Sequence, residues 1–230
     1  MREAIILAGG FGTRLRSVVS DVPKPMAPVA GRPFLSYLLD DLVRQEYRHV
    51  VLATGYMHEK VEEYFGRDYR GMAIDYARET SPLGTGGAIV NGLQHCTEDW
   101  ITVLNGDTLF KADHGQLLHK AALAGRLTIL LRAVPDAGRY GSVVTDPATG
   151  RITAFCEKNP EIKQGLINAG VYRMRRSLLD GWVLGQKFSF EKEVLQTLSE
   201  PFYAYACDGY FIDIGIPEDY SRAQTELPQL

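Results

Sequence analysis

Apolar positions along the chain switch between short continuous runs and helical spacing. One run covers residues 4–8, leucines then recur at helical spacing between 35 and 43, and a second run follows at 50–53. Short apolar runs predict strands buried on both faces, and recurrence every three or four residues predicts amphipathic helices. A strand, a helix and a strand in this order predict a βαβ unit with parallel strands.

The same alternation continues to the end of the chain. Further helices are predicted at 57–65, 88–93, 189–198 and from Pro217 onward, and further strands at 74–77, 100–104, 127–132, 166–172, 202–207 and 210–214. Segments 139–143 and 152–155 flank a turn at 146–150 and predict a more exposed, mixed part of the sheet. We therefore predict one α/β domain over residues 1–230, with a Rossmann-like, mostly parallel (mixed) sheet flanked by helices.

Composition narrows the class of protein. The 230 residues suffice for one sizeable core, and a net charge of -3 gives no support for a nucleic-acid partner. No apolar run approaches the ~20 residues that cross a bilayer, so we expect no membrane association. The three cysteines, Cys96, Cys156 and Cys207, are odd in number and far apart, which favours a reducing, cytoplasmic compartment over a disulfide framework or a zinc cluster.

The first strand ends in a glycine-rich loop. Gly9, Gly10 and Gly12 allow the backbone to approach a phosphate closely. Arg14 follows directly, and Lys24 stands between two prolines ten positions later, so two cations of different geometry accompany the loop. A dinucleotide site fits poorly, because the glycines do not form G-x-G-x-x-G and no acid follows at the expected distance.

A second glycine-dense loop, 79–88, enters a predicted helix at the same edge of the sheet. A tight, well-capped turn would explain it structurally, but its place at the carboxyl end of a strand favours contact with a ligand. Asp107 stands at another strand end, and Asp213 stands between apolar residues. Each carboxylate is placed to hold a hard cation, with a turn-forming or capping role as the alternative for Asp107.

A further helix is predicted between the strands 100–104 and 127–132, and it carries two histidines. His114 and His119 are five residues apart and so lie on different helical faces. We expect both to be surface or capping residues, not metal ligands.

In order, segments 7–15, 23–29 and 31–33 resemble the signature of the sugar-1-phosphate nucleotidylyltransferases. Within that family, 16–22 most resembles the guanylyltransferases that act on D-glycero-α-D-manno-heptose 1-phosphate. The resemblance covers essentially the whole chain, with sugar-phosphate-binding elements in about 140–215. It implies transfer of a nucleoside monophosphate, with GTP as donor, to the sugar 1-phosphate. The products would be GDP-heptose and pyrophosphate, for capsule, surface-layer or other cell-surface glycans.

The resemblance also implies a site. Arg14, Lys24 and Asp107 would be catalytic, with Arg14 on the triphosphate and Lys24 on the α-phosphate. Asp107 and Asp213 match the metal-binding aspartates and would share one Mg²⁺. The implied nucleotide-binding residues are Leu7, Ala8, Gly9, Gly10, Gly12, Thr13, Arg14, Lys24, Glu79, Pro82, Gly84, Thr85, Gly106 and Asp107. Glu79 or a backbone carbonyl of its loop could select guanine through the N–H donors of that base.

The resemblance implies that four residues bind the sugar phosphate. Glu157 and Asn168 would hydrogen-bond sugar hydroxyls, and Lys158 would pair with the phosphate. The backbone at Gly141 would lie along the sugar. The implied partners are therefore a nucleoside triphosphate and a sugar 1-phosphate, and a homodimer is compatible with the sequence.

The sequence motifs do not exclude other pairs of substrates. They are mannose 1-phosphate with GTP, N-acetylmuramate or N-acetylglucosamine 1-phosphate with UTP, and glucose 1-phosphate with another nucleotide. A non-catalytic nucleotide-sugar sensor would be marked by loss of Arg14, Lys24 or a metal aspartate, and all of these residues are present.

Overall fold

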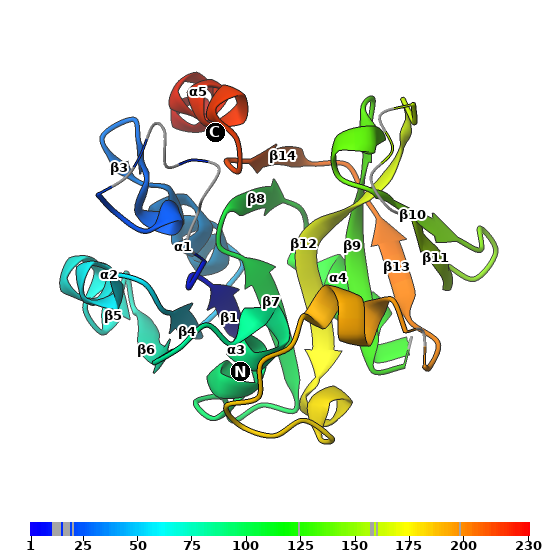
Figure 1. The fold of residues 1–230 in the computed structure, drawn as a ribbon, viewed down its shortest axis with the longest axis horizontal. Helices are drawn as coiled ribbons and strands as arrows, with labels where there is room; N and C mark the ends of the chain where they lie inside the picture. The colour runs from blue at the N-terminus through cyan, green and yellow to red at the C-terminus, as the bar shows by residue number, and fades with distance from the viewer. Residues whose placement is uncertain are drawn as a thin grey trace.

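A mixed sheet runs through the centre of the computed structural model (Figure 1). The structure describes residues 1–10, 15, 19, 21–123, 125–156, 159, 161–197 and 199–230. Within these residues the sheet has eight strands, in the order β13 (Tyr203–Ala206), β9 (Leu127–Val134), β12 (Gly165–Arg175), β7 (Trp100–Asn105), β1 (Glu3–Leu7), β4 (His49–Thr54), β6 (Met72–Arg78) and β5 (Asp68–Tyr69).

Most neighbouring strands are parallel. β7, β1, β4 and β6 form a parallel block, and β13 is parallel to β9. β12 is antiparallel to both of its neighbours, β7 and β9, and the edge strand β5 is antiparallel to β6. The predicted mostly parallel, mixed sheet is confirmed, and the reversal at β12 divides it into two halves.

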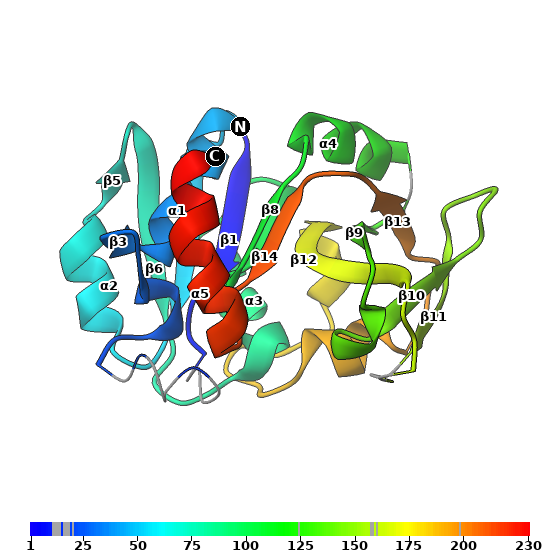
Figure 2. The same ribbon diagram turned by 90° about the horizontal axis from the view of Figure 1, so that it is seen from above.

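Helices cover the sheet on both sides (Figures 1 and 2). They are α1 (Phe34–Arg44), α2 (His58–Phe65), α3 (Gly84–Leu93), α4 (His114–Leu123) and α5 (Pro217–Glu226). Successive residues of a strand face opposite sides, so Ile6 packs in one apolar cluster with α1 while Ile5 packs in a second cluster with α3. Both side chains are fully buried, as the continuous apolar run of β1 predicts.

Among the described residues there are also three two-stranded sheets, with β10 (Ser142–Thr145) on β11 (Ile152–Cys156), β8 (Thr108–Lys111) on β14 (Tyr210–Asp213), and β2 (Pro28–Val29) on β3 (Arg32–Pro33). The strand predicted at 210–214 therefore forms but lies outside the main sheet. The same holds for the segments 139–143 and 152–155, which are predicted as part of the sheet and instead correspond to the separate β10–β11 pair. The antiparallel partner of β14, β8, leads away from β7, which brings Asp213 opposite Thr108. α5 follows and packs on β14 (Figure 2).

The predicted helix at 189–198 is a single π-helical turn, η4 (Glu191–Leu195). The Ser189 hydroxyl accepts the Lys192 N–H (3.2 Å), and the Glu193 carboxylate accepts the Ser189 N–H (2.9 Å), so side chains bind two backbone N–H groups at the start of this turn. Short 3₁₀ turns also occur, among them η1 (Lys24–Met26) and η2 (Ala137–Arg139).

The surface position expected for His114 is wrong, although His119 is exposed. The His114 ring is fully buried, with Nδ1 3.2 Å from the Tyr47 hydroxyl. That hydroxyl lies 2.7 Å from Thr102 Oγ1, which also accepts a hydrogen bond from Arg173 (3.1 Å). Burial, with a smaller effect of the nearby Arg2 charge, lowers the pKa of His114 to about 4. The first residue of α4 thus turns inward, to the junction of β7 and β12.

None of the helices in the described ranges is long and apolar enough to cross a membrane. All three cysteines are free thiols. Cys96 is buried, and Cys156 and Cys207 are half-buried.

Candidate active site

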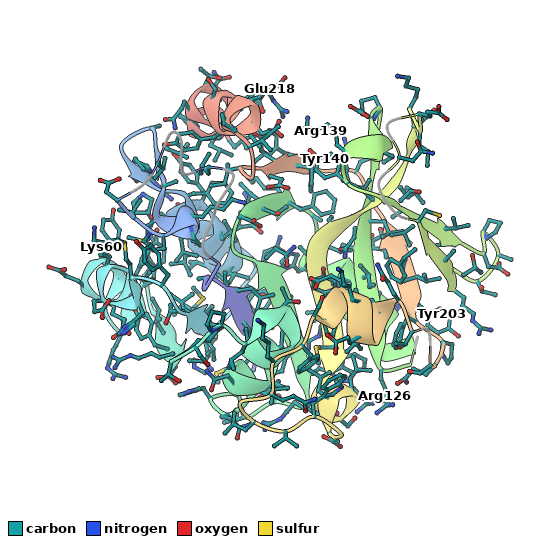
Figure 3. All side chains as sticks on the ribbon, viewed as in Figure 1. Lys60, Arg126, Arg139, Tyr140, Tyr203 and Glu218 are labelled. Carbon is teal, nitrogen blue, oxygen red and sulfur yellow. The ribbon has the colours of Figure 1, made fainter. Side chains whose placement is uncertain are left out.

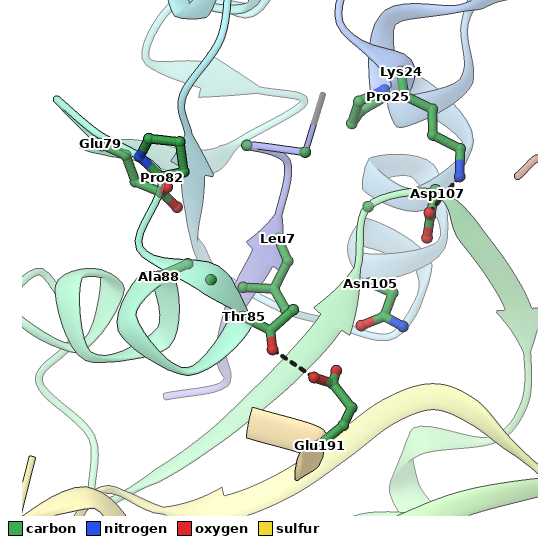
Figure 4. A pocket seen from close by; sticks show the side chains of 14 residues that line it. Leu7, Lys24, Pro25, Glu79, Pro82, Thr85, Ala88, Asn105, Asp107 and Glu191 are labelled. Carbon is green, nitrogen blue, oxygen red and sulfur yellow. Dashed lines mark hydrogen bonds and ion pairs between the residues drawn. The ribbon is translucent and has the colours of Figure 1, made fainter. Parts of the chain in front are cut away.

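A pocket of about 340 Å³, here called the main pocket, opens at the carboxyl ends of β1 and β7 (Figure 4). It is lined by Leu7, Gly9, Gly10, Lys24, Pro25, Glu79, Pro82, Gly84, Thr85, Ala88, Asn105, Gly106, Asp107 and Glu191. Carboxyl ends of parallel strands are the usual place for a ligand in open α/β sheets. Ten of the predicted nucleotide-binding residues lie here, whereas Ala8 is buried behind the pocket. Gly12, Thr13 and Arg14 lie outside the described residues.

Two glycines allow the walls of the main pocket to approach closely. A Cβ at Gly106 would lie 2.4 Å from the Leu7 carbonyl oxygen, and the Gly106 N–H bonds to that oxygen at 3.0 Å. Gly84 has a positive φ of 72°, and a Cβ there would lie 2.5 Å from the Phe188 carbonyl oxygen. Gly10 differs, because a Cβ there would meet nothing within 4 Å. The first two glycines are needed by the fold, and Gly10 leaves room for a ligand.

Lys24 reaches Asp107 at one end of the main pocket (Figure 4), and a second carboxylate, that of Asp213, lies within 4 Å of it. The Lys24 Nζ is 2.5 Å from Asp107 Oδ2 and 3.9 Å from Asp213 Oδ1. Asp107 follows β7, and Asp213 ends β14, where its Oδ1 accepts the Gly215 N–H (2.7 Å). The β8–β14 pairing therefore brings together two acids that are far apart in the sequence.

This donor set fits a hard divalent cation. Carboxylate oxygens are the ligands that Mg²⁺ takes from proteins, and Mg²⁺ completes its octahedron with water and substrate phosphate oxygens. Within the described ranges, no cluster of three or more His, Cys, Asp or Glu side chains could enclose a metal. A cation held by Asp107 and Asp213 would keep open positions for a substrate, because two carboxylates fill only part of its coordination shell.

Glu79 forms the opposite wall of the main pocket. It follows β6, and its Oε2 accepts the Leu83 N–H (3.1 Å). Burial raises the pKa of this carboxyl group, with a smaller opposing effect from the Leu83 N–H. Glu79 also borders a hollow of about 190 Å³ that includes Gly55 and Tyr56. A partly desolvated carboxylate in this position is a strong acceptor for the N–H groups of a ligand.

A second hollow of about 150 Å³, here called the side pocket, lies on the β12 side of the molecule. It is lined by Tyr140, Gly141, Ser142, Val143, Phe155, Cys156, Asn168, Glu191, Leu195 and Gln196. The structure thus brings Gly141 and Asn168 together as predicted, whereas Glu157 and Lys158 lie outside the described residues.

The side pocket has fixed walls. Asn168 donates to the Tyr172 hydroxyl (2.8 Å) and accepts the Gly170 N–H (2.9 Å), which leaves its amide one hydrogen and one lone pair for a ligand. Tyr140 packs edge-on against Phe211, and Arg139 donates to the buried Asp219 at 2.6 Å. Figure 3 shows Arg139 and Tyr140 on the same side of the molecule as Glu218, the neighbour of Asp219 in α5. The loop that carries Gly141 is thereby tied to the start of α5.

A model of the nucleotidyl transferase family matches residues 3–229. The chain belongs to this family. It is 46% identical over 228 residues to D-glycero-α-D-manno-heptose 1-phosphate guanylyltransferase of Aneurinibacillus thermoaerophilus, with 98% of each chain covered. It is 43% identical over 220 residues to the enzyme of the same name from Campylobacter jejuni subsp. jejuni, covering 95% of this chain and 96% of that one.

A solved structure is also similar over its full length. The crystal structure of HddC from Yersinia pseudotuberculosis complexed with GMP-PN matches with a TM-score of 0.89 and 35% identity. The match covers 99% of this chain and 100% of HddC. The fold of this nucleotidyl transferase is therefore that of its relatives, and the predicted family is confirmed.

Sequence reasoning assigned no ligand role to two polar residues of this nucleotidyl transferase. Asn105 lines the main pocket directly before Gly106 and Asp107, and its place at a strand end could have identified it. Glu191 was read only as part of a helix start, yet it lines both pockets. No local signal marks Glu191, because its partner Thr85 is 106 residues away.

Proposed function

We propose that this nucleotidyl transferase transfers GMP from GTP to D-glycero-α-D-manno-heptose 1-phosphate and releases pyrophosphate. The observation that carries the proposal is the pair of adjoining pockets, with Lys24 and Asp107 lining one end of the larger one and Asp213 within 4 Å of Lys24. The near-full-length similarity to two heptose 1-phosphate guanylyltransferases supports the choice of substrates.

The reaction needs no side-chain nucleophile. An oxygen of the sugar phosphate attacks the α-phosphorus of GTP in line, a new P–O bond forms, and the bond to the β-phosphate bridging oxygen breaks. The two substrates are both polyanions, so positioning and placed positive charge supply most of the acceleration. Lys24 provides such a charge beside Asp107. We assign Arg14 to the triphosphate and Lys158 to the acceptor phosphate.

Mg²⁺ is the cofactor that we propose. Asp107 and Asp213 would hold it, and when bound it would neutralise charge on the phosphates. The Lys24 Nζ lies within 4 Å of both acids, 2.5 Å from Asp107 and 3.9 Å from Asp213, which places the two carboxylates close enough to share one cation.

Base and sugar are assigned to opposite ends of the site. The Glu79 carboxylate matches the N–H donors on the Watson–Crick edge of guanine. Asn168 and the backbone at Gly141 would contact the heptose, together with Glu157. We further propose a cytoplasmic enzyme whose product serves cell-surface glycan synthesis, and free thiols are typical of that compartment. A homodimer is compatible with this assignment.

The test is product analysis of the purified protein with GTP, the heptose 1-phosphate and Mg²⁺. We expect stoichiometric pyrophosphate and a product with the mass of GDP-heptose, both abolished by EDTA and restored by excess Mg²⁺. Binding of GTP without any pyrophosphate would contradict the proposal and favour a nucleotide-sugar sensor.

A further inference from the structure

Glu191 is the one described residue that lines both the main pocket and the side pocket. Figure 4 shows its side chain rising from η4 into the main pocket, toward Thr85 and on the same side as Asn105. If GTP and the sugar phosphate occupy the two pockets, this carboxylate lies where they meet.

The Glu191 carboxylate is held in place by two hydroxyl groups. Its Oε2 accepts hydrogen bonds from Thr85 Oγ1 (2.5 Å) and Ser189 Oγ (3.0 Å). The Thr85 hydroxyl in turn accepts the Phe190 N–H at 2.9 Å, which commits its hydrogen to Glu191. Phe190 is buried in the core, so the whole arrangement is anchored to the fold.

These hydrogen bonds all use one oxygen. Within the described part of the chain, no hydrogen bond reaches Oε1, which remains available as an acceptor. A carboxylate donates nothing, so it repels phosphate oxygens and needs a ligand that carries an N–H or O–H group. Glu79 already faces the part of the main pocket assigned to the base. The remaining neutral donors on the two substrates are their sugar hydroxyls.

We propose that Glu191 determines specificity by accepting a hydrogen bond from a sugar hydroxyl where the two pockets meet. This inference rests on the proposed function, because it requires both substrates in adjoining pockets. The hydroxyl belongs to the ribose of the nucleotide or to the ring of the acceptor, and both rings present the same chemistry. A site built to bond a hydroxyl rejects the analogue that lacks it, since the acceptor is then left unpaired.

The variant that tests this role is Glu191→Gln. Glutamine keeps a carbonyl oxygen for Thr85 and Ser189 but replaces the other oxygen with a donor, which cannot accept the ligand hydroxyl. Glu193→Gln is the matched control, because Glu193 lies on the same turn, is exposed and lines neither pocket. Equal melting temperatures of the three proteins would show that the fold is retained.

The measurement is kcat/KM for GTP, 2′-deoxyGTP and 3′-deoxyGTP, and separately for the heptose 1-phosphate and its 2-, 3- and 4-deoxy analogues. We expect the wild type and Glu193→Gln to discriminate about tenfold to 100-fold against one of these analogues. Glu191→Gln should lose a comparable factor on the intact substrates and lose discrimination at that hydroxyl alone. The analogue affected identifies the ring.

Two results would overturn the inference. One is an equal loss on every substrate with all ratios unchanged, which would mean that Glu191 only supports Thr85. The other is discrimination in Glu191→Gln that equals the wild type at every hydroxyl. Calorimetric binding of the same nucleotides and sugar phosphates repeats the comparison without turnover. An absence of catalysis by the wild type, which would contradict the proposed function, is thus distinguishable from failure of the Glu191 assignment.

Discussion

The two pockets of this protein are built in different ways. The main pocket takes several of its residues from short segments that directly follow parallel strands, such as Gly9 after β1, Glu79 after β6 and Asp107 after β7. The side pocket combines an antiparallel strand, a hairpin and the η4 turn. A site at the ends of parallel strands can be located from the sequence strand by strand, whereas a site between antiparallel elements depends on pairing across long separations.

The two halves of the main sheet are joined by the antiparallel strands β7 and β12. At one end of this pair, Asn105 packs against Gly170, where a Cβ would lie 2.8 Å from the Asn105 amide nitrogen. At the middle of the pair, where Thr102 lies opposite Arg173, is the buried polar network that also includes His114. We therefore expect a substitution in one pocket to change the kinetics of one substrate. A substitution in the buried network should change the stability of both halves of the sheet.

The largest effect is expected at Lys24. Lys24→Ala, or Asp107→Asn, should lower kcat by about 10²–10³-fold, because the first removes a placed positive charge from the reacting phosphates and the second removes a proposed Mg²⁺ ligand. Pyrophosphate release under saturating substrates measures it, with Lys187→Ala as the control, since Lys187 is exposed and lines neither pocket. Near-wild-type turnover in either variant would contradict the assignment of the reacting phosphates to this end of the main pocket.

Glu79→Gln tests the opposite wall and should affect the base alone. We expect kcat/KM for GTP to fall about tenfold to 100-fold while KM for the sugar phosphate is unchanged, because the amide offers guanine one acceptor fewer. The raised pKa of Glu79 means that it protonates at a higher pH than an ordinary glutamate. As the pH is lowered, KM for GTP should therefore begin to rise at a higher pH in the wild type than in the variant. Equal GTP kinetics in Glu79→Gln and in the exposed control Glu63→Gln would contradict the assignment.

Asn168→Ala should act on the side pocket. The amide has one hydrogen and one lone pair left for a ligand, so its loss should change relative kcat/KM among sugar 1-phosphates by about tenfold. KM for GTP should remain at the wild-type value. An unaltered sugar preference, or an equal loss of kcat/KM for the nucleotide and the sugar phosphate, would contradict the functional division between the two pockets.

His114 should affect stability and leave catalysis at neutral pH unchanged. The folded state keeps His114 neutral down to about pH 4, whereas the unfolded chain binds a proton below its ordinary pKa of 6.5. The free energy of unfolding should therefore fall by up to about 3 kcal/mol between these two pH values. Urea denaturation of the wild type and His114→Phe across this range measures the difference. Parallel pH profiles of the two proteins would contradict it.

The sequence was informative where chemistry follows a strand directly. It predicted the glycine loops, Lys24 and the two acids, and the structure brings Lys24, Asp107 and Asp213 together. It did not predict the β8–β14 pairing that makes this possible, because register between distant antiparallel strands has no local signal. It missed the ligand-facing position of Glu191 for the same reason, and it placed His114 at the surface because spacing on a helix does not show which face is buried. The roles of Arg14, Glu157 and Lys158 stay predictions.

The central claim is that the main pocket selects GTP and the side pocket selects the manno-heptose 1-phosphate. The direct measurement is pyrophosphate release with Mg²⁺ for four nucleoside triphosphates, each combined with heptose, mannose, glucose and N-acetylglucosamine 1-phosphates. We predict turnover with GTP and the heptose phosphate well above every other pair. Faster turnover with UTP, or with mannose 1-phosphate, would contradict the assignment of the pocket concerned.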